Sequence, residues 1–185
     1  VIHNPLDPKY AYVPKEFDSN QPIILHIRTG WNKNLKRSIE ALKGIPCHFR
    51  IIGKINEGII SLLKQNDINY SNVYGSTDEE IHKEYINSDI INFPSMYEGF
   101  GMPIIEGQAI GRVVLTSQIE PLIEVSGSAV CFVNPTDLDS ITNGYIKIIN
   151  DNRFRENLIS LGLENVKRFE VRKIAEQYIN LYRNI

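Results

Sequence analysis

The stretch FPSMYEGFGMPIIE, residues 93–106, decides the fold of this chain. It starts at the end of a short apolar run, and Pro94 stops a strand there because proline has no N–H to give to a sheet. Gly99 and Gly101 permit backbone angles that other residues avoid, and Pro103 suits the first position of a helix. The stretch therefore predicts the end of a buried strand, a glycine-bearing loop and a helix N-terminus.

This loop combines the features of an anion site with two acidic side chains. Free amides at a helix N-terminus point toward the space above the sheet, where they favour an anion. Glu98 in the loop and Glu106 in the helix bracket these amides. Carboxylates placed around an anion site need another role, and accepting hydrogen bonds from sugar hydroxyls is the most direct one.

Composition is that of one ordinary soluble domain over residues 1–185. The chain is long enough for a real core, its apolar fraction is 42% and its charged fraction is 23%. The net charge of -2 gives no reason to expect nucleic acid or an anionic membrane as the main partner. Cys47 and Cys131 both lie in apolar runs, and we interpret them as reduced core thiols.

Strand and helix patterns alternate about six times along the chain. Residues 1–21 contain several prolines and little periodicity, and we interpret them as an N-terminal segment that leads into the domain. Strands are expected at residues 22–28, 47–52, 73–74, 89–93, 113–116 and 129–133. Helices are expected at residues 33–43, 57–65, 135–150, 153–167 and 171–185. Two more are expected, one after a cap at Ser76 or Thr77 and one that starts at Pro103.

This alternation predicts an α/β fold with a doubly wound, Rossmann-like parallel sheet of about six strands and helices on both faces. Ligands of such sheets bind in the crevice beyond the carboxyl ends of the strands. Chemistry is therefore expected in the loops after the first four strands, at residues 28–33, 53–54, 75–77 and 98–106.

The polar residues in these loops also have purely structural interpretations. Glu106 could be a first-turn acid stabilised by the helix dipole, Glu98 a solvated loop acid, and Lys33 a surface lysine on a helix. Asp137 and Asp139 have the spacing of a metal-binding pair, but they follow a proline at a helix start. We interpret Asp137 as a helix cap, and no metal site is assigned.

The run Pro-Ser-x-x-Glu-Gly-Phe-Gly-x-Pro-x-x-Glu at residues 94–106 resembles the signature of the retaining glycosyltransferase family 4. Residues 24–42 resemble the first βα unit of the C-terminal domain of that family, and residues 73–80 resemble its third. Residues 135–137 and the helices after them resemble its tail. The resemblance covers essentially the whole chain and implies one half of the two-domain GT-B fold.

The resemblance implies that the domain binds a nucleotide diphosphate sugar. Glu106 would accept hydrogen bonds from the ribose hydroxyls, and Glu98 would contact hydroxyls of the transferred sugar. Lys33 would neutralise the diphosphate as it leaves, so Glu98 and Lys33 are the candidate catalytic residues. The other expected donor contacts lie in the loops: Gly99, Phe100, Gly101 and Met102 at the sugar and diphosphate, and Gly53, Lys54, Gly75, Ser76 and Thr77 at the base.

The pair Arg28-Thr29 departs from the family, which commonly has Gly-Arg or Gly-Thr at this place. Both residues are expected near the donor. If Arg28 replaces the glycine, a bulky side chain stands where the backbone normally approaches the diphosphate. If Arg28 serves as the phosphate arginine, its spacing to Lys33 fits. Both interpretations stay open.

The resemblance also implies a reaction and partners. The full-length protein would transfer a hexose or related sugar, with retention, from a UDP-, GDP- or ADP-sugar to a saccharide or lipid-linked acceptor, as in polysaccharide biosynthesis. It would need no cofactor and no bound metal. The facing N-terminal acceptor domain would be missing from this chain, which we therefore expect to be inactive alone. A cytoplasmic location is expected, with peripheral attachment to the inner membrane face as an option.

Two other classes of protein remain as alternatives. A nucleotide-sugar 2-epimerase has a related two-domain architecture but normally lacks the run at residues 94–106. A non-enzymatic, nucleotide-binding or regulatory α/β domain of flavodoxin-like type would show a phosphate loop or an acidic pocket after its first strand, and residues 28–33 show neither. In a titration with UDP, GDP and ADP, a folded domain that binds none of them would favour the structural or regulatory alternative.

Overall fold

A computed structural model describes residues 1–184 and contains one six-stranded parallel sheet with the strand order β3-β2-β1-β4-β5-β6. The strands are β1 (Ile23–Ile27), β2 (His48–Ile52), β3 (Tyr70–Val73), β4 (Ile90–Phe93), β5 (Val113–Ser117) and β6 (Cys131–Val133). The strand order reverses direction between β1 and β4. In such a sheet the crevice beyond the carboxyl ends of these two strands is the usual ligand site. The predicted fold class is confirmed.

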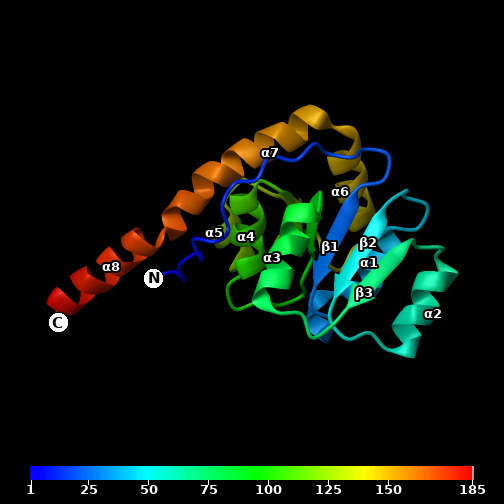
Figure 1. The fold of residues 1–185 in the computed structure, drawn as a ribbon, viewed down its shortest axis with the longest axis horizontal. Coiled ribbons are helices and arrows are strands. Elements are labelled where there is room, and N and C mark those ends of the chain that lie inside the picture. The colour runs from blue at the N-terminus through cyan, green and yellow to red at the C-terminus, as the bar shows by residue number, and fades with distance from the viewer. Residues whose placement is uncertain (185) are drawn as a thin grey trace.

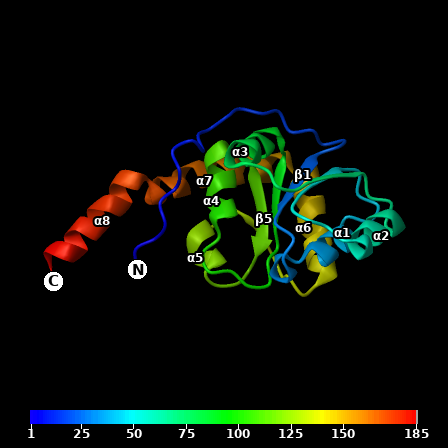
Figure 2. The same ribbon diagram turned by 60° about the horizontal axis from the view of Figure 1, so that its bottom comes forward.

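Helices cover both faces of the sheet (Figures 1 and 2). On one face lie α1 (Leu35–Ala41), α2 (Glu57–Gln65) and α6 (Leu138–Asn150), and on the other lie α3 (Asp78–Asn87), α4 (Met102–Ile110) and α5 (Leu122–Ser126). The chain then continues through α7 (Asn152–Asn165), the 3-10 turn η2 (Val166–Phe169) and α8 (Val171–Arg183). In Figure 1, α8 projects from the body of the domain beside the N-terminus. Over residues 1–184, every helix is too short or too polar to span a lipid bilayer.

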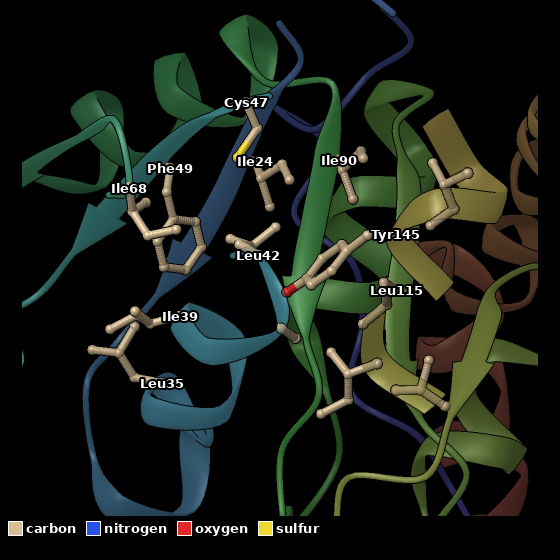
Figure 3. Close-up of a cluster of buried hydrophobic side chains, with 14 of the residues drawn as sticks. Ile24, Leu35, Ile39, Leu42, Cys47, Phe49, Ile68, Ile90, Leu115 and Tyr145 are labelled. Carbon is tan, nitrogen blue, oxygen red and sulfur yellow. The ribbon is translucent and has the colours of Figure 1, made fainter. Parts of the chain in front are cut away.

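Alternation along β1 places its side chains in two core clusters, one on each face of the sheet. Ile24 packs with α1, α2 and α6, whereas Leu25 and Ile27 pack with α3, α4 and α5, because successive strand residues point to opposite faces. Figure 3 shows the first cluster, where Phe49 and Tyr145 are the largest fully buried side chains. Helices cover both faces of the sheet. The place that remains for a ligand is the row of loops at the ends of the strands.

Several predicted boundaries are wrong, most consequentially at residues 33–43. Lys33 ends a short 3-10 turn, η1 (Trp31–Lys33), and Asn34 separates it from α1 with a left-handed φ of 60°. Asn34 holds this break because its Nδ2 donates to the carbonyls of Pro94, at 3.0 Å, and Pro135, at 2.8 Å. Lys33 therefore belongs to a tethered loop and not to a helix.

The other differences are at short or terminal elements. β3 begins at Tyr70 and ends at Val73, so the strand predicted at residues 73–74 was placed too late. The five-residue helix α5 was not predicted, because it is too short to show a period. Of the helix predicted at residues 171–185, α8 accounts for Val171–Arg183, and residue 185 lies outside the described residues.

Two predicted caps are confirmed. The Thr77 hydroxyl accepts from the Glu80 N–H at 3.3 Å, and Glu80 Oε2 accepts from the Thr77 N–H at 2.7 Å, which completes a capping box for α3. Asp137 Oδ1 accepts from the Asp139 N–H at 3.0 Å at the start of α6. The Asp137 side chain thus has a structural partner.

A buried polar chain crosses the first core cluster and predicts acid sensitivity. Asn92 Nδ2 lies 2.9 Å from His26 Nδ1, and the Tyr145 hydroxyl donates to Asn92 Oδ1 at 2.7 Å. Burial, followed by the charge of Lys33, lowers the pKa of His26 to about 3. Below its ordinary pKa of about 6.5, His26 would take up a proton only in the unfolded chain, so stability is lost as the pH falls.

We expect this one side chain to reduce the free energy of unfolding by about 2 kcal/mol between pH 7 and pH 5. Denaturant unfolding at both pH values, for the original chain and for His26→Phe, measures the effect. The variant should lose about 2 kcal/mol less than the original over this interval, whatever its stability at pH 7. An identical pH dependence in both proteins would show that His26 is not the acid-sensitive group.

Candidate functional site

A cavity of about 340 Å³ opens beyond the carboxyl ends of β1 and β4, at the reversal of the strand order. Seven of the residues predicted for the donor site line it: Arg28, Lys33, Glu98, Phe100, Gly101, Met102 and Glu106. Six further residues, not predicted, complete the wall: Tyr10, Ile27, Asp78, Ile81, Tyr85 and Pro103. The cavity therefore unites the loop after β1, the loop after β4, the helix α3 and the start of α4.

Hydrogen bonds fasten the loop after β1 to the loop after β4. The Met96 N–H donates to the Asn32 carbonyl at 2.7 Å, and Asn32 Nδ2 donates to the Tyr97 carbonyl at 3.0 Å. One bond joins backbone to backbone and the other joins a side chain to backbone, so the two loops are held together at two points. This arrangement brings Lys33 and Glu98, which are 65 residues apart in the sequence, to the same wall.

Lys33 Nζ and Glu98 Oε1 form an ion pair, and both side chains are about nine-tenths buried. The ammonium group also lies 4.9 Å from the centre of the Phe93 ring. The interpretations of Lys33 as a surface lysine and of Glu98 as a solvated acid are therefore wrong. A buried charge is tolerated when it is paired, and each of these groups depends on the other.

Glu106 lies in the fifth position of α4, beyond the first turn, so the structure does not support a role as a first-turn acid. Its Oε2 accepts from the hydroxyl of Tyr85 at 2.5 Å. Burial raises the pKa of Glu106, while the hydrogen bond from Tyr85 and then the charge of Arg28 act against this rise. The site thus holds a mostly buried carboxyl group next to a cation and a phenol.

Gly101 is required in this loop by both conformation and space. It is the N-cap of α4 with a φ of 111°, and a Cβ atom there would lie 2.7 Å from Leu122 Cδ2. Gly99, two residues earlier, has no such neighbour within 4 Å. The amide-bearing turn at the start of α4 therefore depends on Gly101 much more than on Gly99.

Gly101→Ala is expected to lower the free energy of unfolding by about 2 kcal/mol, from left-handed strain and overpacking together. Gly99→Ala is the matched control, with an expected change within about 0.5 kcal/mol. Denaturant unfolding of both variants makes the comparison. Equal losses in the two variants would contradict a specific requirement for glycine at position 101.

Arg28 has the backbone conformation of one role that the sequence left open, whereas its role at a phosphate stays a prediction. Its φ of 68° is the left-handed conformation that glycine adopts easily, so in backbone terms Arg28 replaces the glycine. Its N–H donates to the Ile52 carbonyl at 2.7 Å, and its side chain lines the cavity and lowers the pKa of Glu106. A guanidinium group therefore stands at the cavity wall, where a phosphate could reach it.

The other predicted residues lie outside the cavity wall: Thr29, Gly53, Lys54, Gly75, Ser76, Thr77 and Gly99. Some of them join neighbouring loops. The Thr29 hydroxyl donates to the Lys54 carbonyl at 2.6 Å, and a Cβ atom on Gly53 would lie 2.9 Å from Thr29 Cγ2. The expected contacts of these loops with a base stay predictions.

Tyr10 and Tyr85 are the wall residues that matter most among those not predicted. Tyr85 on α3 is fully buried, and the Tyr10 ring lies edge-on to it with the ring centres 5.4 Å apart. Tyr10 belongs to the N-terminal segment, residues 1–21. Nothing local in the sequence connects a residue of that segment with the middle of the chain, so only the fold could bring these two side chains to Glu106.

A second cavity, of about 260 Å³, lies where the N-terminal segment crosses Gly111 and α7. The polar groups there serve packing. Asp89 pairs with Lys15 and accepts from the Ile23 N–H at 2.8 Å, and Arg112 donates to the carbonyls of Val13 and Ile86. Within residues 1–184, no cluster of three or more metal-binding side chains is present.

The family model described as "Glycosyl transferases group 1" matches residues 13–164. The O-antigen chain mannosyltransferase B of Escherichia coli is 34% identical over 106 residues, which cover 57% of this chain and 28% of that protein. The MMP alpha-(1->4)-mannosyltransferase of Mycolicibacterium hassiacum is 28% identical over 130 residues, which cover 68% of this chain and 31% of that protein. The chain therefore spans less than half the length of these relatives.

Solved structures share the fold over nearly the whole chain. A sucrose-phosphate synthase from Thermosynechococcus elongatus matches with a TM-score of 0.82 and 24% identity, over 99% of this chain and 51% of that one. The Anabaena protein HepE, solved in complex with UDP and glucose, matches with a TM-score of 0.79 and 17% identity, over 90% of this chain and 49% of that one. At these identities the likeness concerns the fold.

Proposed function

This chain belongs to the family of group 1 glycosyl transferases, and we propose that it is the donor-binding domain of a retaining enzyme of family 4. In this proposal the chain is one half of a two-domain GT-B protein. The coverage of 51% and 49% of the two solved chains supports a second half of similar length, which would bind the acceptor. Transfer would run from a nucleotide diphosphate sugar to a saccharide or lipid-linked acceptor, on the cytoplasmic side of the membrane.

The observation that carries this proposal is the charge pattern of the 340 Å³ cavity. Of its three carboxylates, Asp78 lies at the start of α3, and the other two, Glu98 and Glu106, face it from either side of the N-terminus of α4; two cations, Lys33 and Arg28, face it from the loop after β1. The helix N-terminus and the cations suit a diphosphate. Each glutamate suits hydroxyl groups at one end of that diphosphate, sugar on the Glu98 side and ribose on the Glu106 side.

Lys33 would act when the bond between sugar and diphosphate breaks. Negative charge then grows on the departing phosphate, and an ammonium group fixed by Phe93 and Glu98 lowers the energy of that state without reorganising. Because Lys33 and Arg28 supply positive charge, we propose that transfer needs no bound metal or cofactor. We expect the complete enzyme to keep transferring sugar from the donor when a metal chelator is present. Loss of transfer under these conditions would contradict the proposal that no bound metal is needed.

Binding by this domain tests the proposal directly. Calorimetric titration with UDP, GDP and ADP should give a dissociation constant in the micromolar to millimolar range for at least one of them. Because relatives above are mannosyltransferases by name, mannose-bearing donors come first in the panel of sugar nucleotides. A folded domain that binds none of the three nucleotides would favour a structural or regulatory module.

The division between the two carboxylates has its own test. Glu98→Ala also releases Lys33 from its ion pair, which changes the affinity for both ligands alike. The expected result is therefore a fall of about tenfold in the affinity for the sugar nucleotide relative to that for the free nucleoside diphosphate, because Glu98 is assigned to the sugar. Titration of the variant with both ligands measures this. A similar loss for both ligands would show that Glu98 does not contact the sugar selectively.

A further inference from the structure

Tyr85 donates a hydrogen bond to the Glu106 carboxylate, and it comes from a different helix. Its hydroxyl lies 2.5 Å from Glu106 Oε2, and its side chain is 0% exposed. Because Tyr85 is covered, it acts on a ligand only through Glu106. Tyr10 packs edge-on against its ring, which restricts the phenol to this direction.

The surroundings of Glu106 show what this bond does. Burial disfavours its charged form, and of the groups that face it Asp7 acts in the same sense, while Arg28 and Lys9 act against it. Tyr10 and Asp78 also line the cavity beside it. A hydrogen bond from Tyr85 favours the ionised carboxylate, which accepts hydrogen bonds at both oxygens, over the neutral acid, which would donate.

We propose that Tyr85 is the positioning residue at the nucleoside end of the site. Its hydroxyl holds Glu106 Oε2, so that Oε1 is presented to the two vicinal ribose hydroxyls. This inference rests on the proposed function of the cavity. It adds that the preference for a ribonucleotide depends on a phenol that touches no ligand. The carboxylate has two oxygens, and fixing one of them sets the direction of the other.

Tyr85→Phe removes the hydroxyl and keeps the ring, so it tests the inference with little change in packing. The ligands are the nucleoside diphosphate that binds best and its 2′,3′-dideoxy analogue. We expect the variant to bind the ribonucleotide about tenfold more weakly and the dideoxy analogue with unchanged affinity. A general disturbance of the site would weaken both ligands, so the ratio of the two affinities is the diagnostic readout.

Tyr145→Phe is the matched control, because it also removes a buried phenol hydroxyl but on the other face of the sheet, where it donates to Asn92 and does not line the cavity. Its ratio of affinities should equal that of the original chain. Glu106→Asp is a second variant that leaves Tyr85 and the core intact. Its side chain is one methylene shorter, which moves the carboxylate away from the phenol. If Tyr85→Phe does not fold, this variant should show the same selective loss of affinity for the ribonucleotide.

The outcomes separate this inference from the function on which it rests. If the original chain binds no nucleotide, the proposed function fails. If it binds and prefers the ribonucleotide, an unchanged ratio in Tyr85→Phe overturns the positioning role alone. An equal loss of affinity for both ligands in Tyr85→Phe also overturns the positioning role, because Tyr85 would then serve only the packing of α3.

Discussion

In the complete enzyme, Lys33→Met is expected to lower the rate constant of sugar transfer by a factor of about one hundred or more. The change removes a positive charge that is fixed beside the cavity by its ion pair with Glu98 and by the Phe93 ring. The diphosphate gains negative charge as the sugar leaves, so the missing charge costs more in the transition state than in the bound donor. The loss should therefore lie in kcat more than in KM.

Lys36→Met is the control for this prediction, since it makes the same substitution three residues later, at an exposed position of α1. Its transfer rate should match that of the original enzyme. Lys33→Met also leaves Glu98 buried and unpaired, which destabilises the fold. The double variant Lys33→Met with Glu98→Gln removes both charges, and its comparison with Glu98→Gln alone isolates the part of the loss that belongs to Lys33. Transfer at the original rate in a folded Lys33→Met variant would exclude the catalytic role.

The sequence predicts the sheet and its ligand edge well because the signals there are local. Pro94 and Gly101 set the boundaries of the unit from β4 to α4 through their own backbone preferences, and the structure keeps both. The apolar strands 22–28 and 113–116 are recognisable for the same reason. Local chemistry therefore gives the topology, and topology gives the side of the sheet on which a ligand binds.

What the sequence misses depends on contacts between distant residues. Asn34 breaks the predicted helix at residues 33–43 because its amide binds two carbonyls that lie 60 and 101 residues away. The encounter of Tyr85 with Tyr10 and Glu106 joins three separate segments, and no residue type among them marks it in advance. Arg28 is a third case, since its left-handed backbone contradicts the usual preference of a non-glycine residue.

Glu106→Ala is expected to weaken binding of the free nucleoside diphosphate by a factor of about one hundred, the largest effect on affinity that we predict for one side chain. It removes Oε1, which would accept from both ribose hydroxyls, and two hydrogen bonds to a charged group contribute about 3 kcal/mol together. Titration of the variant with the best-bound nucleotide measures the loss. Glu176→Ala, at an exposed position on α8, is the control and should bind normally.

Glu106→Gln should separate function from stability at the same position. The pKa of Glu106 is raised in the folded chain, mainly by burial, so its contribution to stability is present when it is protonated and is lost as the pH rises through the folded pKa. At pH 7 the variant, which carries no charge there and still accepts from Tyr85, should therefore be more stable than the original chain without ligand. This gain should shrink toward pH 4, where the original carboxyl is protonated as well. Thermal unfolding at both pH values, with and without nucleotide, tests the expected gain in stability and its decrease toward pH 4. A variant that is less stable than the original chain at pH 7 would show that the buried charge supports the fold instead of the ligand.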